Sequence, residues 1–129
     1  MAEVITHSLF SEFDINLFKA GKHYRLYEKF GSHPITLNEV KGTYFAVWAP
    51  GAKQVSVIGD FNFWKEGEHL LDVRWDGSGI WEGFIPNVEK GNLYKYKIHS
   101  NHNEIITEKA DPYARRCEHP PNTASVVWE

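Results

Sequence analysis

The sequence contains a single cysteine, Cys117, which cannot form an internal disulfide. This predicts a reducing compartment such as the cytoplasm. A basic surplus is also missing, because the 129-residue chain carries a formal net charge of −3, which argues against a nucleic-acid partner. No run of about 18 apolar residues occurs, and the N-terminus has neither the basic region nor the apolar run of a signal peptide. We therefore expect a cytoplasmic protein that binds neither nucleic acid nor membrane.

Catalytic and metal-binding patterns are missing as well. The sequence has no phosphate-binding glycine loop, and Gly77-Ser78-Gly79 does not form a nucleophile elbow. His99 and His102 have the spacing of a ligand pair only on a helix, whereas their segment is typical of a strand and a turn. The acidic residues that could form a glycosidase pair lie beside turns or a proline, where carboxylates usually bond to local backbone: Asp60, Asp72, Asp76 and Asp111. We expect no catalytic residue, no metal site and no cofactor.

Aromatic residues, by contrast, are abundant at 15% of the chain, and from Thr43 onward the apolar residues recur with a period of two. Asp76-Gly77-Ser78-Gly79 is a strong hairpin signal, with Trp81 placed to pair across it. Short strands with turns at regular spacing predict an all-β fold, an immunoglobulin-like antiparallel β-sandwich. The expected strands cover residues 43–49, 54–58, 70–75, 80–85, 93–99, 104–107 and 123–128.

The residues before the sandwich are expected to form a helical lead-in over 1–33. Ser11 can cap a short helix that ends near Gly21, and a second short helix is expected over 24–30. Neither helix is long enough to be stable alone in water, so both must pack against another surface. The aromatics at this end of the chain, and at its last strand, predict an exposed apolar face for a partner domain: Phe10, Phe13, Phe18, Phe30 and Trp128.

The stretch from Val55 to Trp64 organises the chain. Its first half reads as a strand, and Gly59, Asp60 and Asn62 then break the pattern. Positions 61–64 contain three aromatics, Phe61, Phe63 and Trp64. They are too much apolar surface for an ordinary loop, so some must pack and some can be offered to a ligand. Trp64 either caps the core or forms a flat platform on which a sugar ring can stack.

Gly59-Asp60-Phe61-Asn62-Phe63-Trp64 resembles the signature of the family 48 carbohydrate-binding modules, which precede the catalytic barrel in branching enzymes and isoamylases. Further segments, in the same order and spacing, resemble bacterial glycogen branching enzymes. They are 23–29, 31–34, 45–50, 93–96, 109–114 and 123–128.

The resemblance implies that the chain is the non-catalytic N-terminal module of a 1,4-α-glucan branching enzyme. Such an enzyme, a glycosyltransferase of glycogen biosynthesis, cleaves α-1,4 links and transfers the chain to form α-1,6 branches in a separate (β/α)₈ barrel. We accordingly expect a sandwich over residues 34–129 and a barrel after residue 129 in the parent. The expected partners are an α-glucan, either glycogen or a maltooligosaccharide, and the parent's own barrel.

The resemblance also implies the carbohydrate-binding residues. Trp64 is the first candidate, and Lys95 matches the position where glucan-binding members place a lysine beside the stacked sugar. Asn62 and Asn122 are further candidates, the latter near the asparagine that kinase-type members use before the last strand. Those members carry a second stacking tryptophan in the loop that corresponds to residues 100–105, where this sequence has none. We expect weak binding by the module alone.

Two other interpretations remain open. A free-standing glycogen-targeting module of a regulatory complex is one, although the branching-type lead-in at residues 23–29 argues against it. An immunoglobulin-like adhesion domain is the other, and the missing Cys…Trp…Cys framework disfavours it.

Overall fold

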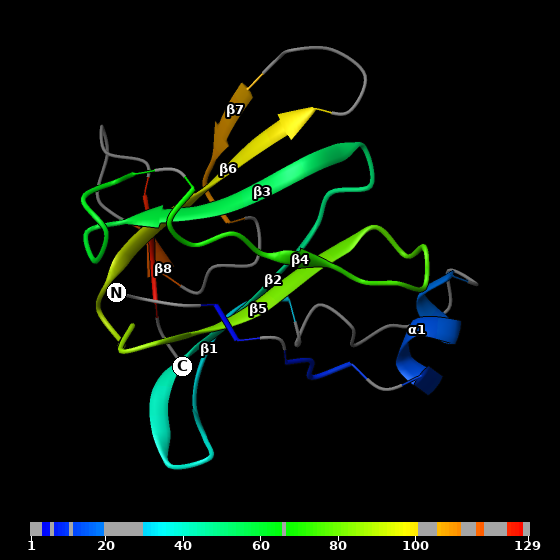
Figure 1. The fold of residues 1–129 in the computed structure, drawn as a ribbon, viewed down its shortest axis with the longest axis horizontal. Helices are drawn as coiled ribbons and strands as arrows, with labels where there is room; N and C mark the ends of the chain where they lie inside the picture. Colours follow the sequence, from blue (N-terminus) through cyan, green and yellow to red (C-terminus); the bar gives the residue numbers. More distant parts are fainter. Residues whose placement is uncertain are drawn as a thin grey trace.

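The structure is a computed structural model, and its described residues form a small β-sandwich with one helix (Figure 1). The expected immunoglobulin-like antiparallel sandwich is confirmed. The described residues are 4–5, 7–10, 12–19, 30–65, 67–100, 106–111, 116–117 and 124–127.

The first sheet has the strand order β1-β2-β5-β4, and all its pairings are antiparallel. Its strands are β1 (Gly31–Leu37), β2 (Val40–Trp48), β5 (Ile80–Pro86) and β4 (Asp72–Val73). The predicted hairpin joins β4 to β5, and Val73 pairs with Trp81 across it, as expected from the sequence.

The second sheet has the order β3-β6-β9-β8, with β7 also paired to β6. Its strands are β3 (Ala52–Gly59), β6 (Leu93–Ser100), β7 (Ile106–Lys109), β8 (Arg116–Cys117) and β9 (Ser125–Val126). Residues 69–71 continue along the free side of β3, because Val57 N donates to His69 O and Leu71 N donates to Val55 O, both at 2.9 Å. The chain then enters β4, so this segment links the two sheets.

The main core lies between the sheets, where alternate residues of each strand point inward. Phe45 packs edge-to-face on Tyr94, with ring centroids 5.0 Å apart, and Tyr94 packs in the same way on Tyr96. The two tyrosine hydroxyls donate to Oδ2 of buried Asp111, at 2.6 and 3.0 Å. Asp111 is therefore a partner of core tyrosines, where the sequence suggested only a bond to local backbone.

A second core covers the outer face of the first sheet. The N-terminal segment begins at the edge of this sheet, where Ile5 exchanges backbone bonds with Phe84 on β5, and α1 (Glu12–Lys19) lies at the β4–β5 hairpin end of the molecule (Figure 1). This helix was predicted, whereas the second expected helix at 24–30 falls almost wholly outside the described residues. The cluster consists of Phe10, Ile15 and Phe30 packed on Tyr44, Ala46 and Ile80.

This second core corrects the expectation of an exposed aromatic face. Phe10 and Phe30 are buried and pack edge-to-face, with ring centroids 5.4 Å apart. They cover the chain's own sheet, so they are not free for a partner domain. The side chains of Phe13 and Phe18, and all of Trp128, lie outside the described residues. The expected boundary between residues 33 and 34 stays a prediction, and β1 spans it.

Candidate functional site

The turn that follows β3 begins at a glycine that sits too close to its neighbours for any side chain. A Cβ at Gly59 would lie 2.2 Å from the carbonyl oxygen of Leu93 and 2.5 Å from the ring of Phe61. The backbone of β3 therefore approaches the start of β6 closely at this point. Phe61 in turn packs against the main core.

Asn62 holds the turn from the inside. Its Oδ1 accepts a hydrogen bond from Gly59 N at 2.9 Å, and its Nδ2 donates to Val57 O at 3.0 Å and to Nδ1 of His69 at 2.8 Å. The side chain is only 2% exposed. Asn62 therefore has a structural role, because its amide is enclosed and its donors and acceptor are used within the turn. That it contacts carbohydrate stays a prediction.

Asp60 ties the same turn to the neighbouring strand. Its Oδ2 accepts from Leu93 N at 3.1 Å, and its Oδ1 accepts from the Asn92 side chain at 3.0 Å. Its own backbone N donates to Leu93 O. The sequence indicated a carboxylate bonded to backbone here, and the structure adds that this backbone belongs to β6.

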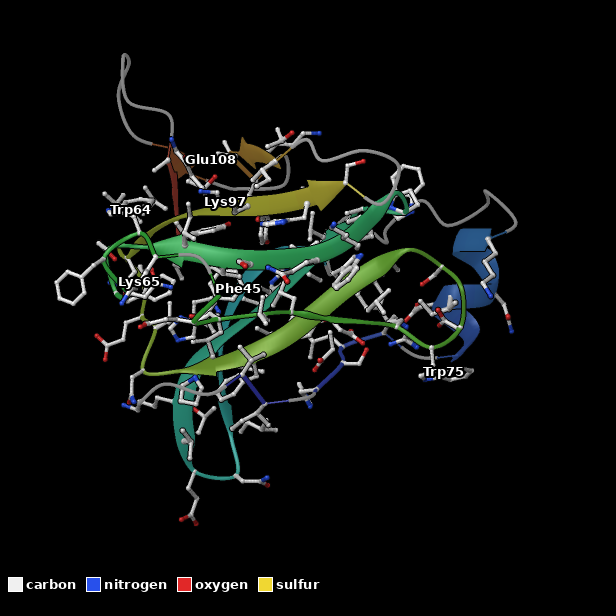
Figure 2. The ribbon with its side chains drawn as sticks, turned by 45° about the horizontal axis from the view of Figure 1, so that its top comes forward. Phe45, Trp64, Lys65, Trp75, Lys97 and Glu108 are labelled. Carbon is white, nitrogen blue, oxygen red and sulfur yellow. The ribbon has the colours of Figure 1, made fainter. Side chains whose placement is uncertain are left out.

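The turn presents two aromatic side chains to solvent. Phe63 is 92% exposed and Trp64 is 40% exposed, and Figure 2 shows Trp64 at the end of β3. Their φ angles are +57° and +59°, in the left-handed region that non-glycine residues rarely adopt. Such backbone costs about 1–3 kcal/mol per residue and persists only where surrounding bonds enforce it. The Asn62 bonds and the bond from Trp64 N to Gly59 O, 2.9 Å, supply that enforcement.

His69 lies behind the turn and was not singled out by the sequence. It is almost fully buried, its ring packs edge-to-face on Phe61, and its Nδ1 accepts the Asn62 bond, which requires a neutral imidazole. Its Nε2 is buried and has no hydrogen-bond partner among the described residues. Burial lowers the pKa of His69, and the nearby Glu68 charge opposes that shift only partly.

The strand register brings Lys95 next to this turn. Lys95 on β6 pairs with Ile58 on β3, the residue just before Gly59. Tyr94 and Tyr96 on either side point into the core, so Lys95 points to the outer face of the sheet, which it shares with Lys97. Asn122, the remaining candidate, lies outside the described residues. Of the other three, Asn62 and Trp64 share the turn after β3, and the register places Lys95 on the adjacent strand beside the start of that turn.

Among the described residues, no group of three or more histidine, cysteine or acidic side chains could hold a metal ion. In the same part of the chain, no helix is long and apolar enough to cross a membrane. Asp76 bonds Ser78 N locally at 3.1 Å, as its turn position suggested.

The fold and this turn define a small β-sandwich domain that fixes a half-exposed tryptophan at one end of a sheet, the arrangement of a binding module. The family model for carbohydrate-binding module 48, the isoamylase N-terminal domain, matches residues 29–114, and the chain belongs to this family.

Curated relatives match almost the whole chain. A 1,4-alpha-glucan branching enzyme GlgB from Aquifex aeolicus is 52% identical over 122 residues, which is 95% of this chain and 19% of that protein. The enzyme of the same name from Aromatoleum aromaticum is 49% identical over 128 residues, 99% of this chain and 19% of that protein. The chain thus spans about a fifth of the length of these relatives.

Solved structures with a similar fold include pullulanases. The chain superposes on a Klebsiella pneumoniae pullulanase complexed with maltotriose with a TM-score of 0.58 and 27% identity, covering 78% of this chain and 9% of that one. A pullulanase from Anoxybacillus sp. LM18-11, complexed with maltotetraose, gives a TM-score of 0.64 over 92% of this chain and 16% of that one. At 22% identity, it supports the fold alone.

Proposed function

We propose that this chain is the non-catalytic N-terminal module of a cytoplasmic 1,4-α-glucan branching enzyme, where it binds α-glucan and docks against the catalytic barrel. The observation that carries the proposal is the match to branching enzymes at about half identity over nearly the whole chain, which fills only a fifth of their length. The parent would cleave α-1,4 links and form α-1,6 branches in the remaining four fifths.

The turn after β3 is the proposed glucan contact. Trp64 offers an apolar indole face to the C–H face of a sugar ring, and a rigid aromatic loses little conformational entropy on binding. Lys95, one strand away, carries three N–H donors for sugar hydroxyls. The fully exposed Phe63 adds apolar surface beside the platform.

Docking against a barrel would draw on exposed apolar side chains away from this turn. Such side chains mark a contact surface where they lie together in a contiguous patch. They are Ile5, Val40, Trp48, Leu70, Val73 and Ile106.

Linkage selectivity tests the proposed ligand class. We expect maltoheptaose to shift backbone amide resonances of residues 60–65 and 95 in an NMR titration, with a dissociation constant on the order of 1 mM, about 4 kcal/mol. Cellohexaose, which has β-1,4 links, is the control and should cause much smaller shifts. Equal shifts with both sugars, or none with maltoheptaose, would contradict the proposal.

The second candidate function, a free-standing glycogen-targeting module, predicts the same glucan binding. The two differ in what the gene encodes after Glu129. A barrel with its catalytic acids supports the first, and a stop codon supports the second. In either case this chain alone should neither branch nor hydrolyse amylose, as measured by iodine absorbance and reducing ends. Turnover that survives repurification would contradict both.

A further inference from the structure

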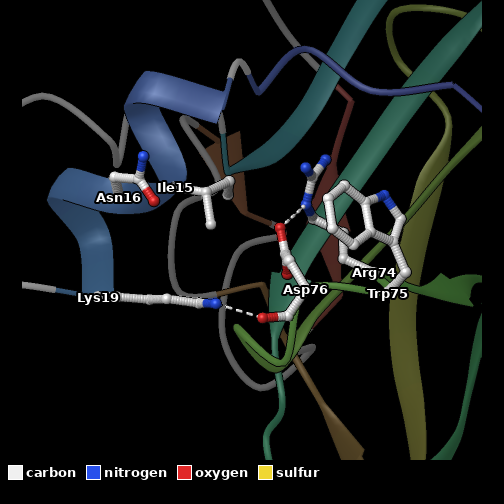
Figure 3. A pocket seen from close by; sticks show the side chains of 6 residues that line it. All are labelled: Ile15, Asn16, Lys19, Arg74, Trp75 and Asp76. Atoms are coloured by element: carbon white, nitrogen blue, oxygen red, sulfur yellow. Dashed lines mark hydrogen bonds and ion pairs between the residues drawn. The ribbon is translucent and has the colours of Figure 1, made fainter.

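A cleft of about 460 Å³ lies at the opposite end of the sandwich from Trp64, between α1 and the β4–β5 hairpin. Figure 3 shows Ile15, Asn16 and Lys19 on the helix side and Arg74, Trp75 and Asp76 on the hairpin side. Figure 2 shows Trp75 and Trp64 at opposite ends of the molecule. The volume lies in the range of about 300–1,000 Å³ that is typical of small-molecule sites.

Trp75 is 87% exposed, which is a large apolar area to leave in water on a soluble domain. It is nonetheless held in place, because the residues on either side of it are fixed. Arg74 Nε donates to Asp76 Oδ2 at 2.9 Å, and Arg74 Nη1 donates to Glu82 Oε2 at 3.0 Å. Arg74 N also closes the hairpin on Ile80 O at 2.8 Å. Trp75 is thus an exposed aromatic on a rigid support.

The charged side chains around the cleft already have bonding partners within it. Arg74 and Asp76 form a buried ion pair, and Lys19 Nζ donates to the backbone oxygen of Asp76. The exposed Asn16 amide and the indole N–H of Trp75 have no hydrogen-bond partner among the described residues. A flat aromatic with unused neutral donors and an amide oxygen favours a neutral, hydroxyl-rich ligand over a charged one.

From this arrangement we infer a second carbohydrate-binding site, in which Trp75 stacks a sugar ring of a linear α-1,4-glucan and Asn16 bonds its hydroxyls. The choice of an α-glucan as the ligand rests on the function proposed above. The cleft and its lining residues are observed independently of that function. Ile15, which is buried in the second core, closes the floor of the site. Two sites at opposite ends of the module would let it hold two chains, or two parts of one branched polymer.

An NMR titration with maltoheptaose can report the two sites separately through their indole N–H cross-peaks. The chain has five tryptophans, and the peaks of Trp64 and Trp75 are assigned by their loss in Trp64→Ala and Trp75→Ala. We expect the Trp75 peak and the amides of Asn16 and Asp76 to shift in wild type and equally in Trp64→Ala. In Trp75→Ala the dissociation constant obtained from the shifts of these two amides should be at least tenfold higher.

Conservative variants distinguish a contact from a loss of structure. Trp75→Tyr keeps a flat ring and should bind within a few-fold of wild type, and Asn16→Ala should weaken this site about fivefold while leaving Trp64 unaffected. Cellohexaose should shift neither set of peaks.

The shifts of the two indole peaks distinguish the second site from the proposed platform at Trp64. If the Trp64 peak shifts to saturation while the Trp75 peak does not move, the second site is wrong and the proposed function stands. If only Trp75 shifts, the second site stands and the proposed platform fails. If neither shifts, both are wrong. Equal shifts of the Trp75 peak with cellohexaose would overturn the α-glucan assignment.

Discussion

Asn62 and Trp64 are two residues apart in the turn after β3 and lie in opposite surroundings, one enclosed and the other half exposed. The sequence marked both as candidate contacts because the motif contains both. Its pattern could predict that aromatics after a strand end must be shared between core and solvent. It could not show that the asparagine supports the turn, because that depends on Val57 and His69 lying beneath it.

Asn62→Ala should lower the free energy of unfolding by about 1–3 kcal/mol, because it leaves Gly59 N and Val57 O without their partner. It should also weaken maltoheptaose binding, since Trp64 is no longer held in its left-handed backbone. Urea unfolding measures the first effect and an NMR titration the second. Gln54→Ala removes a side-chain amide from β3, the strand that precedes this turn, and should change stability by no more than about 0.5 kcal/mol. Equal effects of the two substitutions would contradict the structural role of Asn62.

His69 makes the stability of the turn depend on pH. Its pKa is lowered in the folded state, so the neutral form is favoured there and the unfolded chain takes up the proton first as pH falls. The contribution of His69 to the free energy of unfolding is fully present above its ordinary pKa of about 6.5. It is lost as pH falls from there through the lower pKa of the folded state.

This pH dependence is isolated by comparing wild type with His69→Gln, which keeps an acceptor for Asn62 but cannot titrate. Between pH 7.5 and 5.5 the free energy of unfolding should fall more steeply in wild type than in His69→Gln, as followed by urea unfolding. Parallel pH curves for the two proteins would show that the buried imidazole does not titrate as described.

At the scale of elements, the β4–β5 hairpin and the β6–β7 pair each carry an ion pair in a different setting. Arg74 is buried with Asp76 and Glu82, whereas Lys97 and Glu108 lie 3.7 Å apart on an open sheet face. Burial raises the pKa of Asp76, but hydrogen bonds from Ser78 and Arg74 outweigh this effect, and the net shift is downward. This stabilising contribution is therefore lost only as pH falls below about 3.8.

Arg74→Met should destabilise the domain by about 3–5 kcal/mol, because it leaves two buried carboxylates without their cation. Lys97→Met breaks an exposed pair and should cost no more than about 1 kcal/mol. Thermal and urea unfolding of the two variants give the comparison directly. Similar losses in both would mean that the hairpin network is not the rigid support inferred for Trp75.

The strands with clear period-two patterns could be predicted from sequence, and the structure confirms β2, β3, β5 and β6 to within a few residues. The sequence did not predict β1, because Pro34 lowers strand propensity and is tolerated only where a strand has one free edge. The turn from β1 into β2 was not predicted either. Asn38 and Glu39 both adopt positive φ there, and glutamate is not a residue that signals such a turn. The two-residue β8 is too short for any pattern.

At the scale of the whole molecule, the first sheet is covered on both faces, by the second sheet and by the N-terminal segment. The short length of its expected helices indicated that the lead-in must pack against another surface. It could not decide between the chain's own sheet and a missing partner, since both bury the same aromatics. The sequence also showed no sign of the cleft at Trp75, because α1 and the hairpin meet there only in three dimensions.

The central claim is that Trp64 forms the principal α-glucan contact of this module. Its direct test is titration of wild type, Trp64→Ala and Lys95→Ala with maltoheptaose, monitored on the amides of residues 60–65. Trp48→Ala, which removes another half-exposed indole, is the matched control, and circular dichroism verifies that each variant is folded. We expect Trp64→Ala to abolish detectable binding at this turn, because an aromatic anchor typically contributes 2 kcal/mol or more of a total of about 4 kcal/mol. Lys95→Ala should weaken binding and Trp48→Ala should leave it unchanged. A folded Trp64→Ala variant that binds as tightly as wild type would show that Trp64 only caps the core.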